Sequence, residues 1–377
     1  IATELKTPYF SAGEATEATG SKGSRYSFRT GTDTYALAAA GVPWAMENLG
    51  KNWTMIFPDY AWGHSHHQEH RKLIEAAGGK VNDPIAVPLG TKDLVPYLAR
   101  IPEETEVLFS VFFGALSVAF YTQSKSMRLD EKMKMYSVSG TIEAIDPRDI
   151  NGATEGVYFL ENFPRPLEFK NDEYHAKFIE MMGVDPVYAK EESSGKVMAK
   201  SHAWQSYENF FALKAAIEAS GWQSDKDTPG VIEALEGLKM ENSLAHPQGS
   251  KILRAEDHSG MIDCYMSRVE DSKFVLKKHI PREDLMAKLR PSPPALFSPR
   301  HRETAGAPLR QHETDYEPEN HGRGGPFGAG LPRCPRNRRQ GLRLHSQGGG
   351  GRRAVDRLSG ILRARISRVA GAGGADP

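Results

Sequence analysis

Four histidines fall within the seven positions 64–70, in the stretch DYAWGHSHHQEH, and Glu69 lies among them. Imidazole and carboxylate groups at this density are typical of a metal site. The pair His66 and His70, four positions apart, could hold Zn²⁺ or Cu²⁺ from one face of a helix. A catalytic zinc also needs a third protein ligand and a general base, and the H-E-x-x-H pattern is absent here. A metal-dependent enzyme built on this cluster is therefore one hypothesis, and it requires a third ligand from elsewhere in the chain.

The helix that would carry the cluster favours a different interpretation. Its apolar residues Leu73, Ile74 and Ala77 define a packed face. Helical steps back from Ala77 lead through Leu73 to His70 and His66. The two histidines are then half-buried, neutral packing residues, and they remain only weak metal candidates. We expect neither a metal nor another cofactor.

Polar and aromatic side chains also follow four predicted strands, in the short segments 11–16, 58–63, 113–114 and 139–143. In open α/β sheets, ligands bind outside the carboxyl ends of the strands. Hydroxyls and backbone N–H groups there can hold a carboxylate or an amide. Aromatic rings can wall the apolar part of a ligand, and Glu143 could take an ammonium group. The candidate ligand-binding residues are Ser11, Thr16, Tyr60, Trp62, Phe113, Ser139, Thr141 and Glu143. The four hydroxyl residues could equally be helix caps and turn formers.

The elements that must position these residues alternate along the chain. Strands are predicted at 7–13, 52–57, 80–89, 106–113, 132–139 and 155–163, and helices at 34–50, 65–79, 92–101 and 115–127. This alternation predicts an α/β fold with parallel sheets flanked by helices. Further helices are expected at 171–183, 201–222 and 228–238, and a hairpin at 260–278. In helix 201–222, the stripe Trp204, Tyr207, Phe211 and Ala215 is expected to be core.

Composition excludes several classes of protein for the body of the chain. Hydrophobic residues make up 39% of the 377, which is enough for a core. No run of 18 apolar residues exists, so we expect no membrane span. The first ten residues, IATELKTPYF, lack the pattern of a signal peptide. The two cysteines, Cys264 and Cys334, cannot form a C-x-x-C motif.

Residues 289–377 differ in composition from the rest. From residue 291 onward the chain has 15 Arg, no Lys and seven acidic residues, whereas the first 290 residues have 33 basic and 41 acidic ones. The segment is also rich in glycine and proline, a composition that cannot bury enough apolar surface to fold. We interpret it as a disordered or out-of-frame tail. An Arg-rich nucleic-acid arm is an alternative, but aromatic residues that could stack on bases are almost absent, and we expect no nucleic-acid partner.

Several stretches, taken together, carry a family resemblance. These are RYSFRTGTDTYALA, DYAWG leading into EAAGGKV, PLGTKDLVPYL and HPQGSKILRAEDHSGMIDCYMSRVEDSKF. In this order and spacing they resemble the branched-chain amino-acid-binding family, the leucine-binding-type (type I) periplasmic solute-binding proteins of ABC transporters. The resemblance covers residues 1 to about 288. It implies two Rossmann-like lobes that clamp a solute, docking on the membrane permease subunits, a periplasmic location and no catalysis.

The resemblance also implies a division of the chain, with three departures from the family pattern. Lobe 1 would be residues 1–33 and 162–250, and lobe 2 would be 34–161 and 251–288. The signal peptide and the first strands of lobe 1 are missing, so lobe 1 is expected to be incomplete. Trp62 stands where the family has Tyr or Phe. Ser139 takes the place of an acid, with Glu143 four positions on, so amides, urea-like solutes and aromatic carboxylates become candidates beside amino acids.

The leading hypothesis is thus the substrate-binding component of an ABC uptake transporter for an amino-acid, amide or carboxylate solute. A ligand-sensing domain of a receptor or regulator with the same fold is the first alternative. The metal-dependent enzyme of the 64–70 cluster is the second.

Overall fold

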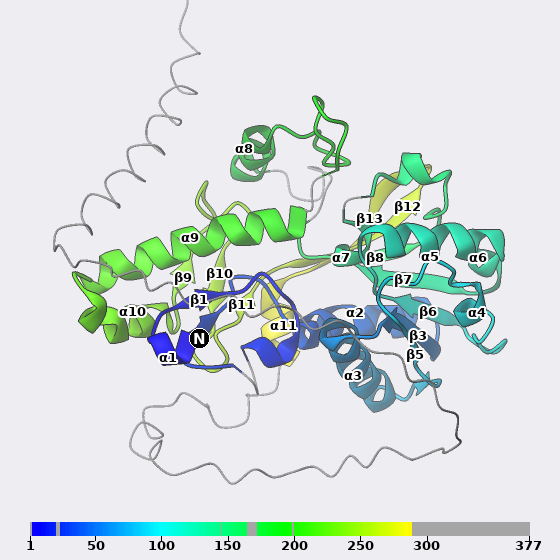
Figure 1. Ribbon diagram of the computed structural model, residues 1–377, viewed down its shortest axis with the longest axis horizontal. Coiled ribbons are helices and arrows are strands. Elements are labelled where there is room, and N and C mark those ends of the chain that lie inside the picture. Colours follow the sequence, from blue (N-terminus) through cyan, green and yellow to red (C-terminus); the bar gives the residue numbers. More distant parts are fainter. Residues whose placement is uncertain (1, 20–22, 144, 164–171, 198–199, 289–377) are drawn as a thin grey trace, which may run out of the picture. The chain divides into compact units, whose positions relative to one another are not determined.

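A computed structural model describes residues 2–19, 23–143, 145–163, 172–197 and 200–288 (Figure 1). The predicted tail, 289–377, lies outside the described residues, and so does Cys334. Within the described part, no helix is long and apolar enough to cross a membrane.

The largest sheet has eight strands, in the order β13-β12-β8-β7-β6-β3-β4, with β5 also paired to β3. Its strands are β3 (Asn52–Pro58), β4 (Lys80–Val81), β5 (Ile85–Val87), β6 (Val107–Ser110), β7 (Lys134–Val138), β8 (Tyr158–Glu161), β12 (Cys264–Glu270) and β13 (Lys273–Ile280). Strands β3 to β8 pair in parallel, whereas β12 is antiparallel to both β8 and β13. The antiparallel pair is the predicted hairpin, and it extends one edge of the parallel sheet.

Helices cover both faces of this sheet because alternate residues of each strand point to opposite faces. Trp53, Met55 and Phe57 of β3 pack on the side of α2 (Thr34–Asn48), α3 (Ala61–Ala76) and α11 (Arg282–Lys288). Ile56 faces the other side. The helices and turns there are α4 (Val95–Leu98), α5 (Gly114–Ser126), α6 (Leu129–Lys132), α7 (Ser139–Ile142) and η2 (Pro147–Ile150). The two cores together account for the nearly continuous burial of β3 and β6.

A second group of elements, which we call the small-sheet region, has its own apolar core around Phe28, Leu235 and Leu253. It contains the parallel pair β1 (Tyr9–Phe10) and β2 (Ser27–Phe28), and the antiparallel strands β9 (Lys239–Met240), β10 (Lys251–Leu253) and β11 (Gly260–Met261). Its helices are α1 (Ala2–Leu5), α9 (Lys200–Ser220) and α10 (Thr228–Leu235), with short turns η1 (Thr16–Ala18) and η4 (Asp225–Asp227). Helix α8 (Glu173–Met182) packs with α9 through Phe178 and Trp204.

The predicted α/β class, with a mostly parallel sheet flanked by helices, is confirmed. The strand predicted at 80–89 is two strands, because residues 82–84, Asn-Asp-Pro, interrupt it and proline has no N–H to donate. The expected stripe of α9 is rotated: Trp204 is buried with Glu208, Ala212 and Ala216, whereas Tyr207, Phe211 and Ala215 are only partly buried. The lobe boundaries at 33/34, 161/162 and 250/251 stay a prediction.

Candidate functional site

Three aromatic rings from two loops of the large sheet lie against one another. Tyr60 is the N-cap of α3 and Trp62 lies in its first turn, after β3, whereas Phe113 is the N-cap of α5 after β6. The ring centroids are 6.1 Å apart for Tyr60 and Trp62, 5.9 Å for Tyr60 and Phe113, and 6.3 Å for Trp62 and Phe113. Phe113 is 46% exposed, and the other two are half-buried. The carboxyl edge of the sheet thus presents an aromatic surface, and its contact with a ligand stays a prediction.

The loop after β7 comes close to this surface. A Cβ atom added to Gly140 would lie 3.2 Å from the Trp62 ring, so the absence of a side chain at position 140 lets the indole rest on the start of α7. Ser139 begins this helix, and its side chain lies outside what the structure describes. Thr141 is buried, and its hydroxyl accepts a hydrogen bond from the backbone N–H of Phe112.

Glu14, from the loop that follows β1, meets the aromatic surface from the small-sheet region. Its Oε2 accepts a 3.1 Å hydrogen bond from Trp62 Nε1, and its Oε1 accepts a 3.4 Å bond from Asn162 Nδ2. His66 Nε2 lies 3.7 Å from Oε2, which is beyond hydrogen-bond reach but close enough for a strong electrostatic interaction. Burial raises the pKa of Glu14, but His66, followed by His202 and the Trp62 indole, outweighs burial and holds the pKa below its ordinary value. A buried carboxylate therefore stays ionised here.

A second carboxylate, Glu143, lies just after α7 and is also buried. Its Oε2 is 2.7 Å from Nδ1 of His202, on the first turn of α9. The hydrogen bond that His202 donates to Glu143 raises the pKa of His202 to about 9, against the opposing effect of burial, and Glu14 adds to the rise. His202 is therefore protonated at neutral pH and joins α9 to the large sheet.

The fully buried Arg29 fixes the backbone of the loop 11–16 by hydrogen bonds. Its guanidinium donates to the carbonyl oxygens of Gly13 at 2.7 Å and Ala15 at 2.8 Å, and to the hydroxyl of Thr19 at 2.9 Å. Because these bonds fix the backbone on both sides of Glu14, the carboxylate is positioned before any ligand arrives.

The predicted hydroxyls of this loop are engaged within the protein. Ser11 Oγ accepts from the backbone N–H of Gly13. Thr16 Oγ1 is 2.7 Å from Thr34 Oγ1, which in turn is 2.6 Å from Ser65 Oγ. These contacts fit the alternative that the hydroxyls are helix caps and turn formers. A contact of Ser11 or Thr16 with a ligand stays a prediction.

The histidines lie as the helix pattern indicates. His66 and His70 are fully rather than half buried, and the His70 ring packs 4.1 Å from that of Phe109. Burial, reinforced by His66, lowers the pKa of His70 well below its ordinary value. His64 lies on the surface, 2.7 Å from Asp59. Among the residues that the structure describes, no group of three His, Cys, Asp or Glu side chains could hold a metal ion.

From the predicted set, the structure brings Tyr60, Trp62 and Phe113 into contact, and Glu143 lies just after α7, paired with His202. Sequence reasoning missed Glu14 and His202. Glu14 is the one acid in the loop 11–16, a signal that was available. His202 carried no signal, because its partner is 59 positions away.

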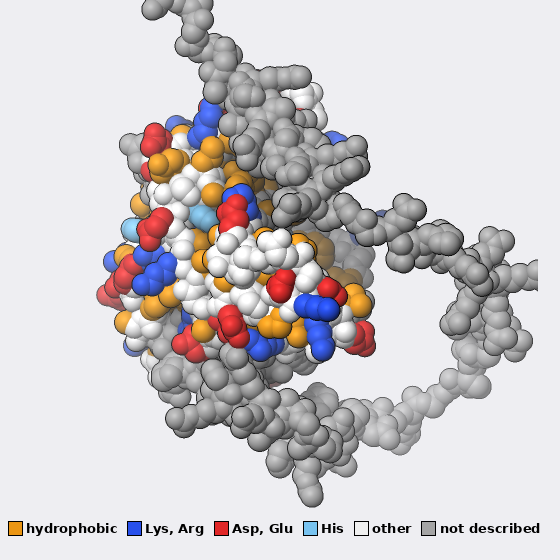
Figure 2. Space-filling model, turned by 90° about the vertical axis from the view of Figure 1, so that its left-hand side faces the viewer, with side chains coloured by type: hydrophobic (Ala, Val, Ile, Leu, Met, Phe, Trp, Pro, Cys, Tyr) orange, Lys and Arg blue, Asp and Glu red, His pale blue; other side chains and the backbone are white. Residues whose placement is uncertain are grey.

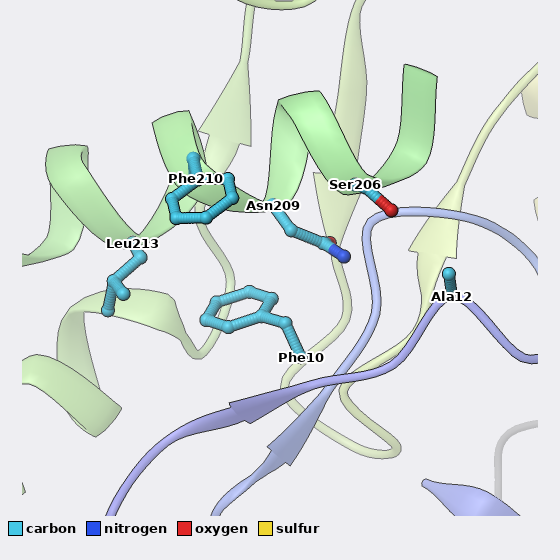
Figure 3. A pocket seen from close by; sticks show the side chains of 6 residues that line it. All are labelled: Phe10, Ala12, Ser206, Asn209, Phe210 and Leu213. Atoms are coloured by element: carbon cyan, nitrogen blue, oxygen red, sulfur yellow. The ribbon is translucent and has the colours of Figure 1, made fainter. Parts of the chain in front are cut away.

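A separate open pocket lies between β1 and α9. Phe10, Asn209, Phe210 and Leu213 line it together with Ala12 and Ser206, and their side chains surround the opening (Figure 3). Phe210 is 76% exposed. On this side of the molecule hydrophobic side chains lie interspersed with acidic and basic ones (Figure 2).

Comparisons with known proteins agree with this fold. The family model described as "Periplasmic binding protein" matches residues 1–273. A solute-binding protein of an ABC transporter from Rhodopseudomonas palustris HaA2, solved in complex with p-hydroxybenzoic acid, is 20% identical, with a TM-score of 0.62 over 74% of this chain and 73% of that one.

Two further solved structures are similar. An ABC transporter substrate-binding protein from Sphaerobacter thermophilus is 20% identical, with a TM-score of 0.63 over 75% of this chain and 76% of that one. A branched chain amino acid ABC transporter periplasmic ligand-binding protein from Burkholderia xenovorans LB400 is 18% identical, with a TM-score of 0.58 over 75% and 73%. The search of curated proteins found no match.

Proposed function

The chain belongs to the periplasmic binding protein family, and from this premise we propose that it is the substrate-binding component of an ABC uptake transporter. The observation that carries the proposal is the meeting of the Tyr60, Trp62 and Phe113 rings with the buried carboxylate of Glu14. An aromatic surface with a few fixed polar groups is typical of a small-molecule site. A member of this family binds its solute without transforming it, so the protein is not an enzyme.

The solute would be held between two lobes, formed by residues 1–33 with 162–250 and by 34–161 with 251–288. Two contacts would join these lobes. The hydrogen bond from Trp62 to Glu14 and the ion pair of His202 with Glu143 both join the first set of residues to the second. Each is a polar contact at the carboxyl edge of the large sheet, where a solute would displace or bridge them. The partners would be the membrane permease subunits, and the location would be the periplasm.

Solute-binding proteins of similar fold have been solved with benzoates, and others are named for amino acids. An amino acid, an amide or a carboxylate is therefore the range of solutes to test. Thermal unfolding of the full chain, followed by calorimetry, should show a higher midpoint with one solute of such a panel. A solute at about 1,000 times its dissociation constant adds about 4 kcal/mol of stability, which shifts the midpoint by several degrees.

The panel should also contain Zn²⁺ as a separate arm. A rise with an organic solute and none with Zn²⁺ supports the proposal. A rise with Zn²⁺ alone would refute the proposal in favour of the histidine cluster.

A further inference from the structure

We propose that residues 184–197, which we call the strap, are a releasable link between helix α8 and the loop 139–150, and that the docked strap holds this loop in place. The loop carries three of the predicted ligand-binding residues, Ser139, Thr141 and Glu143. The inference goes beyond the proposed function, because it holds whatever the protein binds.

The strap passes from one apolar core to another between residues 184 and 188. Val184 packs against the core that contains Phe178 of α8 and Trp204 of α9. Tyr188 is buried in a different core, on the α5 side of the large sheet, which also contains Ile150 of η2. The strap therefore ties α8 to the face of the large sheet on which η2 lies.

Two cations fix the strap to η2. Arg148 of η2 lies over the Tyr188 ring, with its guanidinium carbon 3.7 Å from the ring centroid, and it pairs with Asp146 at 2.6 Å. Lys190 of the strap has its Nζ 3.0 Å from Asp149 Oδ2 and 3.5 Å from Asp146 Oδ2. The buried carboxylate of Asp146 thus faces one cation from η2 and one from the strap, which links the two segments.

The strap keeps its own shape through local hydrogen bonds. The Asp185 carboxylate accepts from three backbone N–H groups within 187–190. Further along, the backbone N–H of Glu191 donates to the carbonyl oxygen of Lys196 at 2.8 Å. Because donors and acceptors of these bonds all lie within the strap, it can leave the surface of η2 without losing them.

The contacts of the docked strap allow its release. The Arg148 side chain is 50% exposed and that of Lys190 is 29% exposed, so water and salt screen their ion pairs. Ala189 is buried with a positive φ of 58°, a conformation that costs free energy for a residue with a Cβ atom. One buried ring, two screened cations and a strained residue make local release require far less free energy than unfolding of the chain.

Release of the strap changes what holds the loop 139–150. At the start of the loop, Gly140 lies against the Trp62 ring, and further on Glu143 pairs with His202 of α9. At its end, η2 is held by the strap. Release therefore frees one end of the loop, and the backbone amides of 139–150 should exchange with solvent faster whenever those of the strap do.

Hydrogen–deuterium exchange of the full chain, followed by mass spectrometry, tests the strap directly. Tyr188→Ser removes the ring that enters the core and lies under Arg148. We expect the amides of 184–197 to exchange at least about tenfold faster, those of 139–150 at least about threefold faster, and those of β3 and β6 as before. Faster exchange in the strap without faster exchange in the loop, or no change in either, overturns the inference.

Charge variants decide the question even if Tyr188→Ser destabilises the whole chain. Lys190→Glu places a like charge beside Asp146 and Asp149, and it should speed the exchange of 184–197 and 139–150 about threefold. Adding Asp149→Lys to Lys190→Glu creates an opposite pair again and should slow both segments. Lys177→Met is the matched control, because Lys177 is 37% exposed and pairs with Glu180 on α8, away from η2; it should exchange as the unaltered chain does. Unchanged exchange in Lys190→Glu, or no slowing in the double variant, overturns the inference.

Discussion

Glu14 and Trp62 form the contact on which the candidate site depends. Glu14 comes from the loop after β1, and Trp62 from the first turn of α3, 48 positions further along the chain. The indole makes two contacts: its ring packs on Gly140, and its N–H donates a hydrogen bond to the buried carboxylate. Neither contact can be predicted from the residue types of Glu14 and Trp62 alone.

Trp62→Leu removes the donor to Glu14 and the ring contact with Gly140. We expect the free energy of unfolding to fall by about 2 kcal/mol, since a buried charged acceptor loses a partner and a half-buried ring is lost. Urea unfolding measures the change. Trp62→His, which keeps a smaller ring with an N–H, should lose less. An equal loss in both variants would show that the hydrogen bond contributes nothing.

The pair His202 and Glu143 predicts a pH-dependent contribution. The pKa of His202 is about 9 in the folded chain and about 6.5 when unfolded. Because the folded value is the higher one, the stabilisation is fully present below about pH 6.5 and is lost as the pH rises through 9. His202 is 53% exposed, so solvent screening keeps the effect below about 1 kcal/mol. The difference in unfolding free energy between the unaltered chain and His202→Gln should be larger at pH 6 than at pH 10. A difference that grows with pH would contradict this assignment.

Among the elements, α9 shows most clearly what a helical pattern can predict. The sequence correctly places Trp204 in the core, but the buried side of the helix also carries Glu208. Glu208 forms an ion pair with Lys251 of β10, which is itself buried and lies over the Trp204 ring. A charged residue in a core stripe becomes acceptable because Lys251, 43 positions away, pairs with one carboxylate oxygen and the backbone N–H of Gln248 donates to the other. Periodicity therefore predicts the helix and only approximately its orientation.

Lys251→Met should be strongly destabilising, because it leaves the Glu208 carboxylate buried without its cation. A loss of about 3–5 kcal/mol is expected in urea unfolding. The double variant Glu208→Leu with Lys251→Met removes both charges and should recover most of that loss. If the double variant is as unstable as the single one, packing and not charge determines the site.

The hairpin of β12 and β13 turns at Asp271 and Ser272, both of which have positive φ angles of 51° and 62°. Glycine adopts this conformation at less cost than serine. Ser272→Gly should therefore stabilise the protein by about 0.5–1 kcal/mol, as measured by the midpoint of thermal unfolding. Ser126→Gly, at the end of helix α5, is the opposite case and should destabilise.

At the scale of the whole molecule, the fold was predictable because its signals are local. The alternation of apolar strands and amphipathic helices predicted the order of the elements from 34 to 163, and the aromatic residues after β3 and β6 were expected at the ligand-binding edge. The polar half of the site was not predictable in the same way. Glu14 and His202 acquire their roles from partners in distant segments, which composition and spacing do not reveal.

The pocket at Phe210 gives a prediction about the molecular surface. Because this side chain is 76% exposed, Phe210→Ser should change the unfolding free energy by less than about 0.5 kcal/mol. Urea unfolding tests this, and a loss of several kcal/mol would show that the ring is covered in solution. Phe28→Ser, in the buried core of the same region, is the contrasting variant and should prevent stable folding.

The indole of Trp62 has one further consequence. Its N–H donates to the Glu14 carboxylate, and its ring lies against those of Tyr60 and Phe113, where the solute is proposed to bind. Of the five tryptophans, Trp53 and Trp204 are fully buried. A solute that binds against these rings would change the surroundings of the half-buried Trp62 and shift its fluorescence emission, whereas the emission of the two fully buried tryptophans would change less. The chain thus carries its own optical reporter of occupancy, and no dye needs to be attached to follow binding in real time.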